Sequence, residues 1–219
     1  MFFWSRQTIE NFAKKHTTPI NYLKKISKII LIDNEENALP LKELQNDGFT
    51  IEQQTAVSPE LLQRLIIGDF DIIILDIKDI ADKHLIKNDG QGVLKYIKEH
   101  NPSQIVIAFS SKKFDMNTQK FFKLADDTMS KPIVFTECKE VLEQIISEKL
   151  NITARWNEFS KMLTLHHFSN KQIKKIEKGL FKKDHSNWKR LLAHLETNSD
   201  LYSLFCTLGT NLAQLLIPR

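Results

Sequence analysis

Residues 71–76, Asp-Ile-Ile-Ile-Leu-Asp, place four consecutive apolar residues between two aspartates. Three of the four are β-branched, and so short an apolar run is typical of a strand that is buried on both faces of a sheet. Residues 29–32, Ile-Ile-Leu-Ile, have the same character and are followed by Asp33. Because such strands need helices on both faces of the sheet, the two runs predict a doubly wound α/β fold.

Segments typical of strands and helices alternate around these two runs, from residue 28 to residue 150. Further strands are expected at residues 49–54, 104–109 and 128–130. Between the strands, apolar residues recur at helical spacing, and Pro40 and Ser58-Pro59 are suited to the first turn of a helix. The other helices are expected over residues 91–99, 117–124 and 136–149. Five strand–helix units in succession favour a five-stranded parallel sheet.

The composition excludes several classes of protein. The 219 residues are 42% hydrophobic and 26% charged, which is typical of a soluble globular chain. No apolar run approaches the ~20 residues that a membrane-spanning helix needs, and the apolar residues 1–4 are too few for a secretory signal. Cys138 and Cys206 lie far apart and form no metal-binding or redox motif. We therefore expect a cytoplasmic protein without a disulfide framework.

The charge is distributed unevenly along the chain. Residues 1–27 have a formal net charge of +4, residues 28–150 of −6 and residues 151–219 of +6. An acidic middle between two basic ends indicates three parts with separate roles. We expect a basic helical extension over residues 1–27 that packs on another domain or subunit, an α/β domain over residues 28–150, and a helical output or interaction domain over residues 151–219.

Polar residues directly follow the predicted strands. In strand order they are Asp33, Asn34, Glu35, Glu36, then Asp76, then Ser110, Ser111, and finally Lys131 and Pro132. In parallel sheets of this kind the ligand site lies at the carboxyl ends of the strands, so we expect these side chains to converge. Carboxylate oxygens suit Mg²⁺, and an aspartate beside Mg²⁺ is a competent nucleophile toward a phosphoryl group. A lysine and a hydroxyl nearby can hold the oxygens of that group.

Four segments of the chain resemble the receiver domain of bacterial two-component response regulators. They are residues 29–37 (IILIDNEEN), 71–77 (DIIILDI), 105–111 (IVIAFSS) and 124–133 (LADDTMSKPI). The resemblance covers residues 28–150, and all five strands fall in the order of the family. The spacing of 43 residues from Asp33 to Asp76 is also typical of the family. The resemblance implies a flavodoxin-like receiver fold over these residues, and the helical pattern of residues 151–219 predicts a small all-α domain after it.

The resemblance also implies a role for each residue of the site. Asp76 would be the phosphoacceptor, Ser110 the switch hydroxyl, and Lys131 the lysine that pairs with the phosphoryl group and precedes a cis bond to Pro132. The implied ligands of Mg²⁺ are Asp33, Asn34, Asp76 and the backbone carbonyl of Lys78. The phosphoryl group would come from a partner histidine kinase or phosphotransfer protein. We expect a regulator and not an enzyme, because its turnover would be at most slow self-dephosphorylation. A phosphohydrolase that uses Asp76 as nucleophile is disfavoured, because Lys78 stands where such an enzyme has its second acid.

Three features depart from the pattern of the family. Asn34 stands where the family has a second acid, so one formal charge is lost and the affinity for Mg²⁺ should fall. Thr128 replaces the usual aromatic switch residue. The loop over residues 77–89 is longer than usual and lacks the Met-Pro pair of the family. These departures leave a second interpretation open, a scaffold protein that keeps the receiver fold and acts without phosphorylation.

Residues 151–219 show no strand pattern and predict a bundle of about four helices. Lysines at positions 171, 174, 175, 178, 182 and 183 place several positive charges on one helical face. A solvated face is the simpler interpretation, and contact with the phosphate backbone of DNA or RNA is the alternative. We expect the output to pass through protein–protein contact or self-association as a homodimer, with a DNA- or RNA-binding regulator as the alternative.

Overall fold

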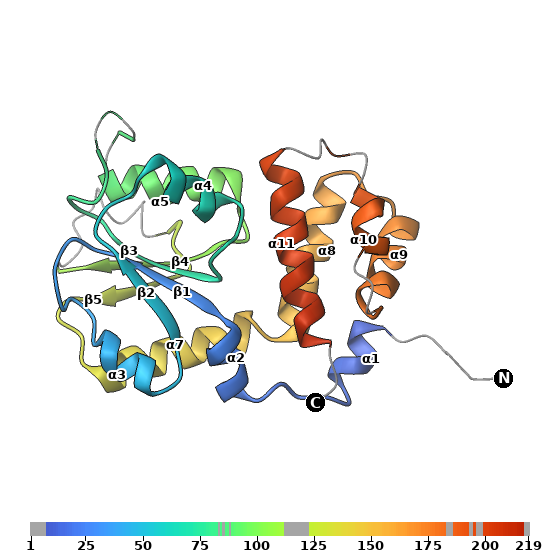
Figure 1. Ribbon diagram of the computed structural model, residues 1–219, viewed down its shortest axis with the longest axis horizontal. Helices are drawn as coiled ribbons and strands as arrows, with labels where there is room; N and C mark the ends of the chain where they lie inside the picture. The colour runs from blue at the N-terminus through green and yellow to red at the C-terminus, as the bar shows by residue number, and fades with distance from the viewer. Residues whose placement is uncertain are drawn as a thin grey trace. The chain divides into compact units, whose positions relative to one another are not determined.

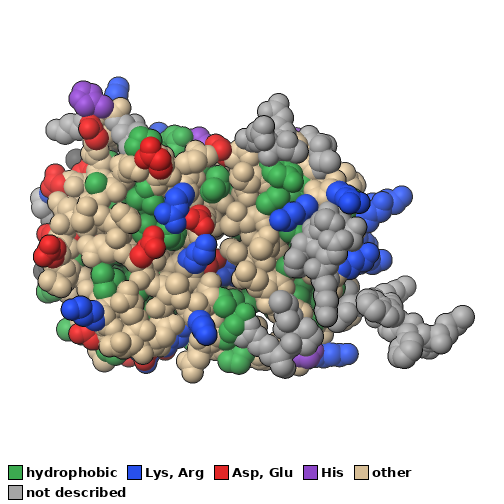
Figure 2. Space-filling model, viewed as in Figure 1, with side chains coloured by type: hydrophobic (Ala, Val, Ile, Leu, Met, Phe, Trp, Pro, Cys, Tyr) green, Lys and Arg blue, Asp and Glu red, His purple; other side chains and the backbone are tan. Residues whose placement is uncertain are grey.

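The structure is a computed structural model that describes residues 8–82, 84, 86–87, 89–111, 123–182, 186–192, 195 and 199–216. These residues form two compact units. The sheet unit comprises residues 20–146, and the helical unit comprises residues 8–19 with the described residues from 147 onward. On the face shown in Figure 2, acidic side chains lie over the sheet unit, and several lysine or arginine side chains project from the helical unit.

The sheet unit contains five strands, all parallel (Figure 1). In chain order they are β1 (Lys28–Ile32), β2 (Thr50–Gln54), β3 (Ile72–Asp76), β4 (Ile105–Ser110) and β5 (Asp127–Ser130). Their order across the sheet is β2-β1-β3-β4-β5, which is the flavodoxin-like order. The predicted doubly wound sheet is therefore confirmed. All five residues of the central strand β3 are buried, as its continuous apolar run predicted.

Helices cover both faces of this sheet. They are α2 (Ile20–Ile26), α3 (Leu41–Asn46), α4 (Pro59–Ile66), α5 (Asp89–His100) and α7 (Phe135–Lys149). Figure 1 shows α4 and α5 on one face and α3 and α7 on the other. The start of α4 is fixed locally, because the side chain of Ser58 accepts the N–H of Leu61 at 3.1 Å. The helix expected over residues 117–124 falls, up to residue 122, outside the described residues.

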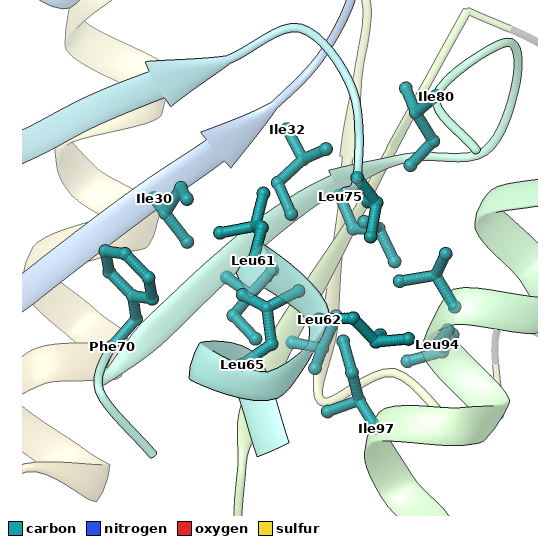
Figure 3. Packing of buried hydrophobic residues seen from close by; sticks show 14 residues of the cluster. Ile30, Ile32, Leu61, Leu62, Leu65, Phe70, Leu75, Ile80, Leu94 and Ile97 are labelled. Carbon is teal, nitrogen blue, oxygen red and sulfur yellow. The ribbon is translucent and has the colours of Figure 1, made fainter. Parts of the chain in front are cut away.

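One cluster of the core lies between the sheet and the helices α4 and α5 (Figure 3). Ile30 and Ile73 of the sheet and Leu65 and Ile97 of the helices are each fully buried. Ile80, which belongs to the loop after β3, also packs into this cluster and is only 1% exposed. The loop over residues 77–89 therefore contributes the side chain of Ile80 to the core.

A buried lysine of α2 connects this helix to α3 and α7. The side chain of Lys24 is 3% exposed, and its Nζ pairs with Asp47 at the end of α3 and lies 2.9 Å from Oε1 of Glu143 in α7. Burial lowers the pKa of Lys24, but the two carboxylates outweigh burial and raise it above 10.5. Hydrogen bonds from Lys139 and Lys24 in turn lower the pKa of Asp47 below 3.8. Both shifts favour the charged forms of Lys24 and Asp47 at neutral pH.

The sequence pattern led us to expect one extension over residues 1–27. The described residues of this stretch belong instead to two different units. The chain divides after Pro19: α1 (Ile9–Ala13) belongs to the helical unit, and α2 belongs to the sheet unit. Helix α1 starts where the backbone N–H of Ile9 donates to Oε1 of Glu177 at 2.9 Å. The two helices have different neighbours, because α1 packs on α8 of the helical unit and α2 packs on β2 of the sheet unit.

The described residues of the chain after α7 are helical, as expected. They form α8 (Ile152–Leu165), α9 (Asn170–Leu180), α10 (Ser186–Lys189), the 3-10 helix η1 (Arg190–Leu192) and α11 (Asp200–Leu215). Trp188 lies fully buried among them and makes an edge contact with Phe159. Gly209 gives the indole its space, because a Cβ there would lie 2.3 Å from Cη2 of Trp188. Among the described helices, none is long and apolar enough to cross a membrane.

Replacement of Lys24 by alanine tests the buried network. We expect Lys24→Ala to lower the free energy of unfolding by about 1–3 kcal/mol, because both the packed stem and the charge are lost. Lys139→Ala is the matched control: Lys139 also pairs with Asp47, but its side chain is 32% exposed, so the loss should stay below about 1 kcal/mol. Chemical denaturation at neutral pH measures both, and equal losses would contradict the structural role of Lys24.

Candidate functional site

Three charged side chains meet at the carboxyl end of the sheet. Nζ of Lys131 lies 2.7 Å from Oδ2 of Asp33 and 3.0 Å from Oδ2 of Asp76. All three are shielded from water, since the side chains are 8% exposed for Lys131, 10% for Asp76 and 0% for Asp33. The structure thus brings together three of the residues that the sequence placed at this site.

The topology of the sheet explains why these residues meet. β1 and β3 are neighbours in register, so Asp33 and Asp76 emerge side by side. Lys131 follows the edge strand β5, and its side chain has to pass the intervening strand β4 to reach them. On that path its Nζ lies 5.1 Å from the ring centroid of Phe109, while its backbone N–H donates to the carbonyl of Ser110 at 3.0 Å. The peptide bond from Lys131 to Pro132 is cis.

The site balances burial against opposite charge. Burial raises the pKa of Asp76 above 3.8, and the negative charge of Asp33 adds to this, although Lys131 and the N–H of Ile77 act in the opposite direction. Burial lowers the pKa of Lys131, but its bonds to Asp33 and Asp76 more than compensate and raise it above 10.5. One ammonium therefore neutralises only one of two buried carboxylates, and this edge of the sheet favours a further positive charge.

The remaining expected site residues lie at the rim. Ser110, the last residue of β4, is half-buried, and the backbone around Lys78 follows Asp76 into an exposed loop. Asn34 is exposed directly after Asp33. Glu35 reaches the site from the same loop, with its Oε2 at 3.3 Å from Nζ of Lys131.

Three other residues named from the sequence lie outside the cluster of Asp33, Asp76 and Lys131. Glu36, Ser111 and Thr128 are exposed, and the structure gives none of them a contact with the buried carboxylates. Thr128 lies on the edge strand β5 with its side chain exposed.

The donor atoms of the site fit Mg²⁺. Among the described residues, no group of three or more acidic, histidine or cysteine side chains could hold a metal ion. A cation here would therefore need the amide oxygen of Asn34 and the carbonyl of Lys78 in addition to Asp33 and Asp76. All of these are hard oxygen donors, and Mg²⁺ usually retains several water molecules beside one or two carboxylates. The unbalanced negative charge of the two buried aspartates favours such a cation.

The sequence analysis missed one carboxylate that shapes this site. Asp89, at the start of α5, accepts three backbone N–H groups of the loop after β3. Its Oδ1 accepts those of Ile80 at 3.0 Å and Ala81 at 2.9 Å, and its Oδ2 accepts that of Asp79. The loop is also held from the other side, since the carbonyl of Ile80 accepts the N–H of Val57 at 2.7 Å. The segment that carries Lys78 thus has a fixed path.

The glycine after Asp89 was the available signal for this arrangement. A Cβ at Gly90 would lie 2.2 Å from the carbonyl oxygen of Asp76, so only glycine lets α5 begin so close to the end of β3. The Asp-Gly pair stands where the loop after β3 ends and α5 begins. In that position the aspartate can accept backbone N–H groups of the loop, and the glycine allows the backbone of the helix to approach the strand closely. Neither partner could be identified from local sequence, because the Asp89 bonds span 8 to 10 residues.

Comparisons with known proteins identify similar structures but no similar sequence. No protein-family model and no curated protein matches the chain. Among solved structures, it is similar to a two-component response regulator from Clostridium difficile (19% identity, 56% of this chain and 97% of that one, TM-score 0.45). It is also similar to the receiver domain of NtrX from Brucella abortus (20% identity, 55% and 99%, TM-score 0.46).

A third similar structure is the receiver domain of the sensor histidine kinase PA1611 from Pseudomonas aeruginosa (16% identity, 56% and 98%, TM-score 0.45). That protein was solved with a magnesium ion coordinated in its active-site cleft. The structural neighbours are thus response regulator receiver domains, the family that the motifs of this chain resemble. Each of them aligns with little more than half of this chain and with nearly all of its own.

Replacement of Asp76 by asparagine tests the electrostatics of the site. Asparagine keeps the shape and removes a charge that burial disfavours, while Lys131 retains Asp33 at 2.7 Å. We therefore expect Asp76→Asn to raise the free energy of unfolding by about 0.5–2 kcal/mol. Asp127→Asn, at an exposed position of β5, should change it by less than about 0.5 kcal/mol. Thermal unfolding at neutral pH measures both, and a destabilised Asp76→Asn protein would contradict this account.

Replacement of Asp89 by alanine tests the loop. Three backbone N–H groups lose their acceptor, so we expect a loss of about 1–3 kcal/mol in stability and faster hydrogen exchange at the amides of Asp79, Ile80 and Ala81. Asp82→Ala is the control, because the Asp82 carboxylate accepts from His84 of the same loop and not from these amides. Equal exchange rates in the two variants would show that Asp89 does not hold the loop.

Proposed function

We propose that this protein is a two-component response regulator whose sheet unit accepts a phosphoryl group on Asp76. The observation that supports this most directly is the position of Nζ of Lys131, within 3.0 Å of both Asp76 and Asp33 at the carboxyl ends of the strands. An ordinary structural ion pair needs one carboxylate. Here a second one is buried without a cation of its own, which is typical of a site prepared for a further charged ligand.

In the proposed reaction a carboxylate oxygen of Asp76 forms a bond to phosphorus. The bond from phosphorus to the imidazole nitrogen of the donor's phosphohistidine breaks, and the donor histidine takes up a proton. The product is an aspartyl phosphate, whose phosphoryl group shares at most two negative charges over three non-bridging oxygens. Lys131 can then turn its ammonium group from the Asp76 carboxylate to those oxygens, and the Ser110 hydroxyl can donate to another.

Asp33, Asn34, Asp76 and the carbonyl of Lys78 would hold Mg²⁺ in this proposal. When bound, Mg²⁺ neutralises charge on the transferring phosphoryl group. Because Asn34 supplies an amide oxygen in place of a carboxylate, the site has one formal charge fewer than the family pattern, and we expect a weaker affinity for Mg²⁺. Glu35, at 3.3 Å from Lys131, is the nearest additional carboxylate.

The proposal includes a partner and an output. The phosphoryl donor is a histidine kinase or a phosphotransfer protein, and the chain itself performs no turnover beyond slow loss of its own phosphoryl group. A phosphoryl group that draws Lys131 and Ser110 inward shifts the end of β4 and the edge strand β5 in population, without a new fold. We place the output in the helical unit, which acts by contact with another macromolecule or with a second copy of the chain.

A scaffold that acts without phosphorylation is the second candidate. The neutral Asn34 and the missing aromatic residue at position 128 support it, because both changes weaken functions that phosphorylation needs. The two candidates differ in one measurable respect, namely whether Asp76 takes up a phosphoryl group.

Intact mass after incubation with acetyl phosphate and Mg²⁺ decides between them. We expect the wild-type protein to gain the mass of one phosphoryl group and Asp76→Asn to gain none. Asp127→Asn, which removes an exposed carboxylate beyond the site, should react like the wild type. Asp33→Asn should react more slowly, with the deficit largest at low Mg²⁺, because it removes a proposed ligand.

Two results would exclude the phosphoacceptor proposal. One is a wild-type protein that gains no mass at millimolar Mg²⁺, and the other is a gain that persists in Asp76→Asn. Either result would leave the scaffold as the better explanation of the fold.

A further inference from the structure

Helix α9 presents a strongly basic face, which we call the lysine face. It consists of Lys171, Lys174, Lys175, Lys178 and, just after the helix, Lys182. All five lysines are exposed. At 3.6 residues per turn they fall within an arc of roughly 100° and extend over about 16 Å along the helix axis. Lysine and arginine side chains project from this side of the helical unit in Figure 2.

The opposite side of α9 fixes the orientation of the lysine face. Ile176 is fully buried and Leu180 is 2% exposed. A Cβ at Gly179 would lie 2.7 Å from Cβ of Trp188, so the helix approaches the core closely there. The first turn is held by a capping box between Ser169 and Gln172. Because this side of α9 is packed against the core, the lysines on the other side of the helix face solvent.

The described residues around this face do not neutralise its positive charge. Glu177 is the single acid between residues 169 and 182. Its Oε1 accepts the backbone N–H of Ile9 at 2.9 Å, so this carboxylate is engaged at the start of α1. Within the part of the chain that the structure describes, none of the five lysines forms an ion pair with an acidic side chain.

The composition of the face selects one kind of partner. Lysine is depleted at the centres of protein–protein interfaces, which rely on aromatic and apolar residues. Residues 170–180 contain no aromatic residue on which unpaired bases could stack, as single-stranded nucleic acid requires. Duplex DNA presents one phosphate charge per ~1.7 Å of its axis and needs only a matching row of cations. We propose that the lysine face binds the phosphate backbone of duplex DNA without reading its sequence.

This proposal goes beyond phosphoryl transfer and does not depend on it. It also changes the preference drawn from the sequence alone, in which the lysine run was taken as a solvated face and the output as protein contact. The exposure of all five lysines of the lysine face and the engagement of Glu177 are the reasons for the change. If four or five of these lysines contact phosphates, the logarithm of the binding constant should fall with the logarithm of the salt concentration with a slope of about −4.

The test is fluorescence anisotropy of a labelled 20-base-pair duplex DNA with the full chain at 50 to 200 mM salt. We expect binding that weakens by about 10²-fold over this range. Lys174→Gln with Lys178→Gln should make the slope less steep by about 2 units, because two phosphate contacts are lost. Lys42→Gln with Lys95→Gln is the control pair, since it removes the same charge from exposed positions of the sheet unit.

Three results would overturn the proposal. The first is no binding of the duplex at 50 mM salt, and the second is an equal change of slope in both pairs of variants. The third is tighter binding of single-stranded RNA, polyglutamate or phosphatidylserine vesicles than of the duplex under the same conditions. Circular dichroism of each variant establishes that the helical unit remains folded, so that a change in slope reports on the lysine face.

Discussion

One buried ammonium group stabilises the carboxyl end of the sheet. Asp33 and Asp76 are forced side by side by the pairing of β1 with β3, and both are withdrawn from water. Two buried carboxylates without a cation would repel each other and lose their hydration. Lys131 supplies the cation from the far edge of the sheet, which is feasible only because β5 is separated from β3 by a single strand. The contact on which the proposed chemistry depends is therefore made possible by the strand order.

A second buried lysine shows by contrast what is particular about that site. Lys24 also bridges two carboxylates from different elements, but Asp47 and Glu143 remain a quarter to a third exposed, and Lys139 supplies a further positive charge. Positive and negative charges are balanced there, and the network serves to hold α2 against α3 and α7. At the strand ends the balance is left negative, and the rim is lined with oxygen donors. The difference in charge balance separates a structural network from a site that can take a ligand.

The helical unit follows a simpler rule, in which the core decides what remains at the surface. Trp188 occupies the space that Gly179 and Gly209 leave free, and α9 can pack only with Ile176 and Leu180 inward. The lysines of α9 are then aligned on the outside by geometry alone. An arrangement that stabilises the core thus also creates the lysine face.

The order of residues alone could predict five strands, a parallel sheet and the positions of Asp33, Asp76 and Lys131 at the carboxyl ends of those strands. It could do so because burial on both faces leaves a continuous apolar run, and because a parallel sheet brings the residues after each run to one edge. Helix starts such as Ser58 were also predictable, since a cap lies within one turn of its partner. Tertiary structure alone decided that Asp89 holds the loop after β3, that Lys24 is buried, and that α1 and α2 belong to different units. Each of these depends on groups that only packing brings together, and no local pattern of residues encodes such a contact.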